Sequence, residues 1–201
     1  YLPRPGVVRL RLTTSGCNEK ELNTLINKEL DKLKNYIKFY EDDINLNLLL
    51  HDFFINKKFS LSVAESCTSG LIASSLTSIA GSSKYFKGGI VAYNNKVKAT
   101  LLGINEELIL QKSSVSEEVV SAMACKVAEK FESNFAIATS GYAGPTSNTK
   151  NIPIGTVFIA VKTPENICVQ KFLFSGSRKI IIEQAKNKAF EMLIGEIKKI
   201  K

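Results

Sequence analysis

The spacing of apolar side chains predicts a strand followed by two helices in the first part of the chain. Residues 7–13 alternate between apolar and polar side chains, a pattern typical of a half-buried strand. Apolar residues then recur at helical spacing over 19–40 and again over 44–57, with charged residues between them. We therefore expect residues 1–43 to form a small α+β domain that precedes the main domain.

From residue 59 onward, apolar runs alternate with segments of helical periodicity. The apolar runs predict strands at 59–65, 88–93, 134–141, 155–161 and 167–174. The periodic segments predict helices at 68–80, 95–102, 116–131 and 178–199. Strands and helices that alternate in this way favour a layered α/β/α sheet, and we assign this domain to residues 44–201.

Composition and charge narrow the classes of partner. The chain has 201 residues, 44% of them hydrophobic, so it can bury a core. No apolar run approaches the ~20 residues of a membrane-spanning helix, and no membrane partner is expected. The net charge of +8 comes mostly from scattered lysines. Base-specific contacts favour arginine, which is scarce, so we do not expect a nucleic acid partner.

Cysteine and histidine usage argues against a metal site. The four cysteines, Cys17, Cys67, Cys125 and Cys168, are scattered, and His51 is the single histidine. A structural zinc site needs four convergent ligands, usually in close sequence pairs. We expect no metal and no other cofactor. Scattered cysteines in a chain of this size are typical of reduced thiols, which predicts a cytoplasmic protein.

Three of the predicted strands end in polar or glycine-bearing segments. The first segment is VAESCTSG at 63–70, and the others lie at 92–98 and 138–148. In open α/β sheets, ligands bind outside the carboxyl ends of the strands. We therefore expect these three segments to form one site.

The first segment suggests nucleophilic chemistry without histidine. Ser66 lies where a helix is predicted to begin, and free N–H groups there favour a developing oxyanion. A partly desolvated lysine with a lowered pKa is a suitable base for a serine. Lys96 and Lys98 both follow the second strand, and sequence spacing does not choose between them. Tyr93 could relay a proton, and Cys67 is the rival nucleophile because a helix N-terminus also lowers the pKa of a thiol.

Six segments occur in the order found in a known family. They are AESCTSG, AGSSKYFKGGIVAYNNKVKATLLGI, SSVSEEVVSAMA, SGYAGP, IPIGTVFIAV and FSGSR. Over about residues 45–200 the chain resembles the C-terminal domain of the CinA (competence/damage-inducible protein A) family. LPRPGVVRLRLT and the helix after it resemble the small domain that precedes it in longer members. The resemblance, together with a start at Tyr1, implies the C-terminal part of a longer protein.

The resemblance implies a metal-free amidohydrolase that converts nicotinamide mononucleotide and water to nicotinic acid mononucleotide and ammonia. Matched to the family's motifs, Ser66 is the nucleophile, Lys98 the base and Tyr93 the third catalytic residue. Arg178 matches an arginine that we assign to the phosphate or ribose of the substrate. The family also implies a homo-oligomer, with a dimer as the first expectation.

Further residues of the matched segments are expected to contact the substrate. They are Glu65, Cys67, Thr68, Gly70, Ser82, Ser83, Asn95, Ser140, Gly141, Ala143 and Gly144. Two departures from the family pattern stand out: Ser69 replaces the first of two glycines, and the 146–152 loop lacks the usual glycines. These departures motivate an alternative, a nucleotide-binding regulatory module with weak or no turnover. A DNA-associated role is a third hypothesis, suggested by the basic charge and the family's name.

Overall fold

The computed structural model describes residues 2–4, 7–9, 12–16, 18–33, 46–146 and 152–200. The chain divides into two units, Tyr1–Asn45 and Leu46–Lys201, two residues beyond the predicted boundary. The N-terminal unit holds a short antiparallel pair, β1 (Leu2–Arg4) and β2 (Val7–Arg9), and the helix α1 (Glu19–Leu33).

Two expectations for the N-terminal unit need correction. The strand predicted over 7–13 ends earlier, because residues 12–16 are not strand, and β1 was not predicted. Its three residues include a proline, which hides the alternating pattern. The helix predicted over 19–40 is present to Leu33, and its remainder lies outside the described residues.

A five-stranded sheet in the order β4-β3-β5-β6-β7 organises the C-terminal unit. The strands are β3 (Leu61–Glu65), β4 (Phe86–Val91), β5 (Phe135–Gly141), β6 (Thr156–Lys162) and β7 (Ile167–Leu173). β4, β3 and β5 run parallel, whereas β6 and β7 are antiparallel to their neighbours. The carboxyl ends of the three parallel strands therefore meet at one edge.

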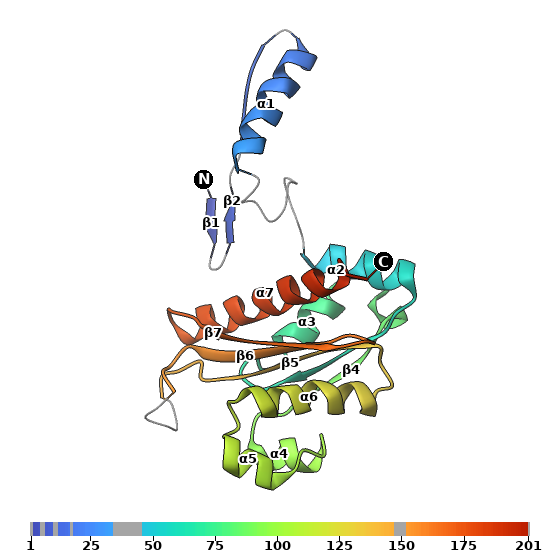
Figure 1. Cartoon of the computed structure of the whole chain (residues 1–201), viewed down its shortest axis with the longest axis vertical. Helices are drawn as coiled ribbons and strands as arrows, with labels where there is room; N and C mark the ends of the chain where they lie inside the picture. The colour runs from blue at the N-terminus through green and yellow to red at the C-terminus, as the bar shows by residue number, and fades with distance from the viewer. Residues whose placement is uncertain are drawn as a thin grey trace. The chain divides into compact units, whose positions relative to one another are not determined.

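Helices cover both faces of this sheet (Figure 1). One face carries α2 (Leu46–Lys57), α3 (Leu71–Thr77) and α7 (Arg178–Ile197). The other carries α6 (Glu117–Lys130), with α4 (Asn95–Thr100) and α5 (Glu106–Lys112) beyond it. The predicted α/β/α layering is thus confirmed. The interior parallel strands β3 and β5 are buried almost throughout, as strands covered on both faces must be.

Small side chains allow α6 to lie close to the sheet. Met123 and Val127 pack with Ala136, Ala138 and Ala160 in one buried cluster. On the opposite face, aromatic rings from α2, from β5 and from the residues that precede β3 and β4 pack at centroid distances of 5.3 to 6.1 Å. The two clusters fix the sheet between its helical layers.

Two helices differ from the sequence prediction. α3 begins at Leu71 rather than at 68, because Ser69 and Gly70 have φ values of 54° and 93° and form a turn. α5 was not predicted because its apolar stripe is short. A side-chain cap starts it, in which the side-chain Oδ1 of Asn105 accepts from the Glu107 N–H.

Two leucines, one in the core and one on the surface, form a matched pair for substitution. Leu76 of α3 is fully buried and Leu110 of α5 is 83% exposed. We expect Leu76→Ala to lower the free energy of unfolding by about 2–5 kcal/mol, since it opens a cavity. Leu110→Ala is expected to change it by less than about 0.5 kcal/mol. Urea denaturation followed by circular dichroism measures both, and equal effects would contradict this core.

Candidate active site

The parallel strands bring the three polar segments to the same edge. Glu65, the last residue of β3, is in register with Val91 of β4 and with Thr139 of β5. Beyond it, the Ser66 N–H donates to the Thr139 carbonyl at 3.0 Å, and the Ala92 N–H donates to the Glu65 carbonyl at 2.7 Å. The site is therefore built on main-chain hydrogen bonds between neighbouring strands.

Ser66 and Lys98 form the centre of this edge. Lys98 Nζ lies 3.1 Å from Ser66 Oγ and donates to the Ala92 carbonyl at 3.0 Å. Both residues are buried, with 7% of Ser66 and 1% of Lys98 exposed. Lys96 is exposed, so the structure brings Lys98 and not Lys96 to the serine.

Helix α4 positions the lysine. The Asn94 side chain caps α4 by accepting from the Val97 N–H at 2.8 Å, and this helix directs Lys98 inward. Asn94 is not among the functional residues predicted from the sequence. An asparagine just before a predicted helix was the signal that could have revealed the cap.

Burial changes the chemistry of the lysine. Desolvation lowers the pKa of Lys98 to about 8, because the charged form loses its hydration. At that pKa, roughly a tenth of the amine is neutral at pH 7, and the fraction rises with pH. A neutral amine 3.1 Å from a hydroxyl is suited to accept its proton.

Cys67 does not meet the requirements of a nucleophile. Its thiol is buried, and desolvation raises the pKa to about 12 despite a hydrogen bond with Thr139. The thiolate, which is the reactive form, is therefore scarce at neutral pH. Lys98 contacts the hydroxyl of Ser66, the preceding residue, instead.

Glu65 caps helix α3 from inside the protein. Its carboxylate accepts from the N–H groups of Gly70 at 3.0 Å, Ile72 at 3.1 Å and Ala73 at 2.8 Å. The side chain is 1% exposed. Sequence reasoning expected Glu65 to touch the substrate, whereas here both carboxylate oxygens hold the turn that carries Ser66.

The turn between β3 and α3 leaves two amides available. The Ser69 N–H donates to the Ser66 carbonyl, and the Gly70 N–H donates to Glu65. Neither the Cys67 N–H nor the Thr68 N–H is hydrogen-bonded to another residue within the described ranges. The Thr68 hydroxyl is 2.8 Å from that of Thr139, which ties the turn to β5.

A second cluster lies at the rim of the site. Arg178, the first residue of α7, donates from Nη1 to the Gly144 carbonyl and from Nη2 to the Tyr93 hydroxyl, both at 2.7 Å. Tyr93 is 57% exposed and directly follows Ala92, whose carbonyl holds Lys98. The structure thus joins three of the predicted residues, with the Tyr93 hydroxyl hydrogen-bonded to Arg178.

At the end of β5, the small size of the residues matters more to the site than free polar groups do. The Ser140 hydroxyl is buried and donates to the Ser114 carbonyl at 2.6 Å. A Cβ at Gly141 would lie 2.5 Å from the Thr156 carbonyl oxygen, so only glycine fits there. Ala143 is buried beside it, and Asn95 is exposed at the start of α4.

The structure separates Ser82 and Ser83 from this site. They lie in the 3₁₀ helix η1 (Ser82–Lys84), which precedes β4. Tyr85, the next residue, accepts a hydrogen bond from the N–H of Leu61, the first residue of β3. This pairing marks the amino ends of the parallel strands, so the two serines lie at the edge opposite Ser66. We predicted substrate contacts for them because they belong to a segment shared with the family. The direction of the chain, which places them before β4 rather than after it, did not enter that prediction.

Neither a metal cluster nor a membrane span emerges from the described part of the chain. No group of three or more His, Cys, Asp or Glu side chains in the described ranges is placed to hold a metal ion. Of the helices described, none combines the length and apolar character needed to cross a bilayer.

Comparisons with known proteins identify relatives of this chain. Residues 44–197 match the family model described as the CinA C-terminal domain. A CinA-like protein of Flavobacterium psychrophilum is 45% identical over 99% of this chain and 49% of its own length. A putative competence-damage inducible protein of Desulforamulus reducens is 35% identical over 96% of this chain and 47% of its own. The chain thus spans about half the length of these relatives.

Solved structures show the same fold. Competence damage-inducible protein A from Klebsiella pneumoniae superposes with a TM-score of 0.75 and 27% identity, covering 78% of this chain and 97% of that one. A competence/damage inducible protein from Agrobacterium tumefaciens gives a TM-score of 0.71 and 33% identity over 79% and 98% of the two chains. From the match over residues 44–197, which covers nearly all of the C-terminal unit, the chain belongs to the CinA family.

Proposed function

We propose that this chain hydrolyses the carboxamide of nicotinamide mononucleotide to nicotinic acid mononucleotide and ammonia. The observation that carries the proposal is a buried lysine amine, with a pKa lowered to about 8, at 3.1 Å from a serine hydroxyl. An amine that is partly neutral near its working pH is an effective general base. The substrate comes from the family resemblance, whereas the Ser-Lys chemistry rests on geometry.

The first half of the reaction forms an ester on Ser66. Neutral Lys98 accepts the hydroxyl proton while Ser66 Oγ bonds to the carboxamide carbon, and the carbonyl oxygen becomes an oxyanion. The N–H groups of Cys67 and Thr68, which donate to no other described residue, are the donors available to stabilise it. The resulting Lys98 ammonium then gives its proton to the departing nitrogen, which leaves as ammonia.

The second half returns the serine. Water attacks the ester carbon while neutral Lys98 accepts one of its protons, and the carbon–Oγ bond then breaks. The ammonium returns the proton to Ser66 Oγ, and the carboxylic acid product loses its remaining proton to solvent and leaves as a carboxylate. The Ala92 carbonyl, 3.0 Å from Nζ, keeps the amine in place through both proton transfers.

Arg178 is suited to hold the phosphate of the substrate. Its bonds to Gly144 and Tyr93 fix the plane of the guanidinium and leave further N–H donors on the same group. Charge-assisted hydrogen bonds to a phosphate are stronger than neutral ones. A phosphate that draws Arg178 away would also release the Tyr93 hydroxyl for proton transfer.

The nucleophile is tested by ammonia release in the presence of EDTA. We expect Ser66→Ala to reduce the rate by at least about a thousandfold, because no acyl-enzyme forms. Ser74→Ala is the matched control, since Ser74 is exposed in α3 and its hydroxyl forms no hydrogen bond with a described residue. If the folded native chain bound the mononucleotide without releasing ammonia, the regulatory alternative would replace this proposal.

The base is tested by the pH dependence of kcat/KM. Because the neutral amine is the active form, kcat/KM should rise with pH through about 8, the lowered pKa of Lys98, and then level off. It should fall about tenfold per pH unit well below that value. Lys98→Arg should be inactive, since a guanidinium does not lose its proton. A rate that falls through pH 8 would assign the opposite protonation state.

The phosphate contact is tested by comparing two substrates. We expect Arg178→Ala to raise KM for nicotinamide mononucleotide by about tenfold or more, the value of a charge-assisted hydrogen bond. Nicotinamide riboside lacks the phosphate, so its KM should change much less. Lys179→Ala, at the next position of α7, is the control for a general loss of charge. Equal losses for both substrates would contradict a phosphate role.

A further inference from the structure

One residue of β5, Thr139, contacts three consecutive residues of the turn that follows β3. Its carbonyl accepts from the Ser66 N–H at 3.0 Å, and its hydroxyl lies 2.8 Å from that of Thr68. The same hydroxyl forms a hydrogen bond with the thiol of Cys67. We predicted no role for Thr139 from the sequence, and expected its neighbour Ser140 to contact the substrate instead. Thr139 therefore holds both the proposed nucleophile and the two residues after it.

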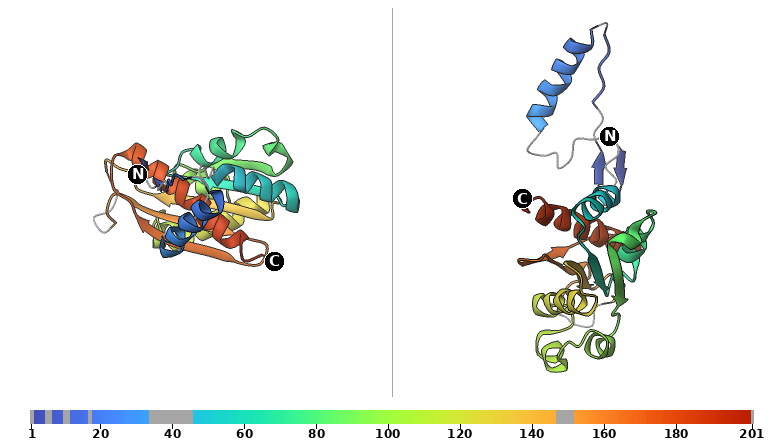
Figure 2. Two further views of the ribbon diagram at one scale, coloured as in Figure 1. Left: turned by 90° about the horizontal axis from the view of Figure 1, so that it is seen from above. Right: turned by 90° about the vertical axis from the view of Figure 1, so that its right-hand side faces the viewer.

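The alternation of β5 directs the Thr139 side chain toward this turn. Ala138 packs in the α6 cluster, so Thr139 points to the other face of the sheet, which carries α3. Phe135 lies on the same side of β5 and packs against Phe54 of α2. The right-hand view of Figure 2 shows the sheet between α7 (red) and α6 (yellow). Because Thr139 is in register with Glu65, the last residue of β3, it lies directly beside the turn.

The hydroxyl contacts of Thr139 are shielded from solvent. Thr139 is fully buried and Thr68 is 1% exposed. A hydroxyl has one proton to donate and two lone pairs that accept, so the Thr139 hydroxyl can serve Thr68 and Cys67 at once. A buried hydroxyl that loses its partner costs free energy. The two threonines therefore hold each other in one arrangement.

We propose that Thr139 is a positioning residue that fixes the two N–H groups of the oxyanion site, those of Cys67 and Thr68. Its carbonyl anchors the chain at the Ser66 N–H, and its hydroxyl anchors the chain at the Thr68 side chain. Both peptide groups that carry these N–H groups lie between the two anchors. The inference rests on the proposed function, in which these amides stabilise the oxyanion.

Amides stabilise a transition state only if they already point to the place where the charge develops. A displacement of about 1 Å can lower a rate by about a hundredfold. Glu65 does not provide this restraint, because the first of the three N–H groups that it binds belongs to Gly70, beyond both oxyanion amides. The restraint on the amides themselves therefore comes from β5.

The role is tested by replacing the Thr139 hydroxyl while keeping the shape of the side chain. Thr139→Val retains the main-chain anchor, so we expect kcat for ammonia release to fall by about 10- to 100-fold and KM to change by less than about threefold. Thr139→Ser retains the hydroxyl and should stay within about threefold of the native kcat. The pH dependence of kcat/KM should keep its midpoint at about 8, because Lys98 keeps its own contacts.

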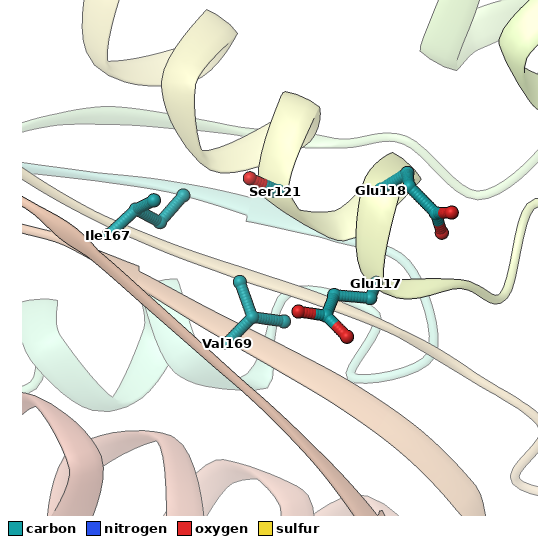
Figure 3. Close-up of a pocket in the computed structure, with 5 residues that line it drawn as sticks. All are labelled: Glu117, Glu118, Ser121, Ile167 and Val169. Carbon is teal, nitrogen blue, oxygen red and sulfur yellow. The ribbon is translucent and has the colours of Figure 1, made fainter.

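Two substitutions serve as controls for a general loss of stability. Ser62, near the start of β3, shares a buried hydroxyl pair with Ser133 at 2.6 Å. Ser62→Ala and Thr139→Val should both lower the midpoint of urea denaturation, because each removes a buried hydrogen bond, but only Thr139→Val should lower kcat. Ser121→Ala changes a hydroxyl in the hollow that α6 and β7 form on the other face of the sheet (Figure 3), and kcat should not respond.

Labelling with an alkyl fluorophosphonate tests the inference without the nucleotide substrate. Ser66 Oγ bonds to phosphorus, fluoride leaves, Lys98 accepts the hydroxyl proton, and the phosphoryl oxygen takes the place of the oxyanion. We expect Thr139→Val to slow this labelling by at least about tenfold, and neither control to change it. If the native chain is labelled but releases no ammonia, the proposed function fails, and the labelling rates alone decide the role of Thr139.

Several outcomes would overturn the inference. They are native rates in Thr139→Val, an equal loss in Ser62→Ala, no recovery in Thr139→Ser, and a pH midpoint that moves, which would assign the loss to Lys98. A native chain that neither releases ammonia nor takes the label would overturn it together with the proposed function.

Discussion

The rest of the site depends on burying one lysine amine at the end of a parallel sheet. An ammonium group loses hydration when it is buried, and two contacts offset only part of that loss, the Ala92 carbonyl and the Ser66 hydroxyl. The carbonyl is available because β4 ends at Val91 and is an edge strand. The position of Lys98 in turn requires α4 to begin at once, which the Asn94 cap ensures. The strand order, the length of β4 and the cap of α4 thus together position a single proton acceptor, the Lys98 amine.

A second buried ionisable group, the Glu65 carboxylate, lies next to Ser66 in the chain. Glu65 takes three N–H groups around the start of α3, so the positive end of that helix is already neutralised within the protein. Negative charge that develops near Ser66 therefore meets the amides before the helix, those of Cys67 and Thr68, rather than the helix itself. Ser69 adopts a positive φ in this turn, a conformation that glycine adopts more easily, at a cost of about 1–2 kcal/mol.

Much of this arrangement followed from the sequence, and the exceptions have physical causes. Alternating apolar runs located all strands of the large sheet, and chain direction then placed three polar segments at one edge. Spacing could not choose Lys98 over Lys96, because that choice depends on the helix cap and on which side of a short helix faces inward. Glu65 was assigned to the substrate because a carboxylate that bonds only to main-chain amides has no sequence signature. Ser82 and Ser83 were grouped by motif, although chain direction separates them.

The main-chain partners of Glu65 have a consequence for how the protein evolves. A carboxylate that pairs with a lysine or arginine can be lost if the partner also changes, since both members are encoded side chains. The amides of Gly70, Ile72 and Ala73 are present whatever side chains stand at those positions. No second-site substitution can therefore compensate for a change at residue 65. Only a side chain of similar reach with an acceptor oxygen could stand in its place, so this position has few open mutational paths.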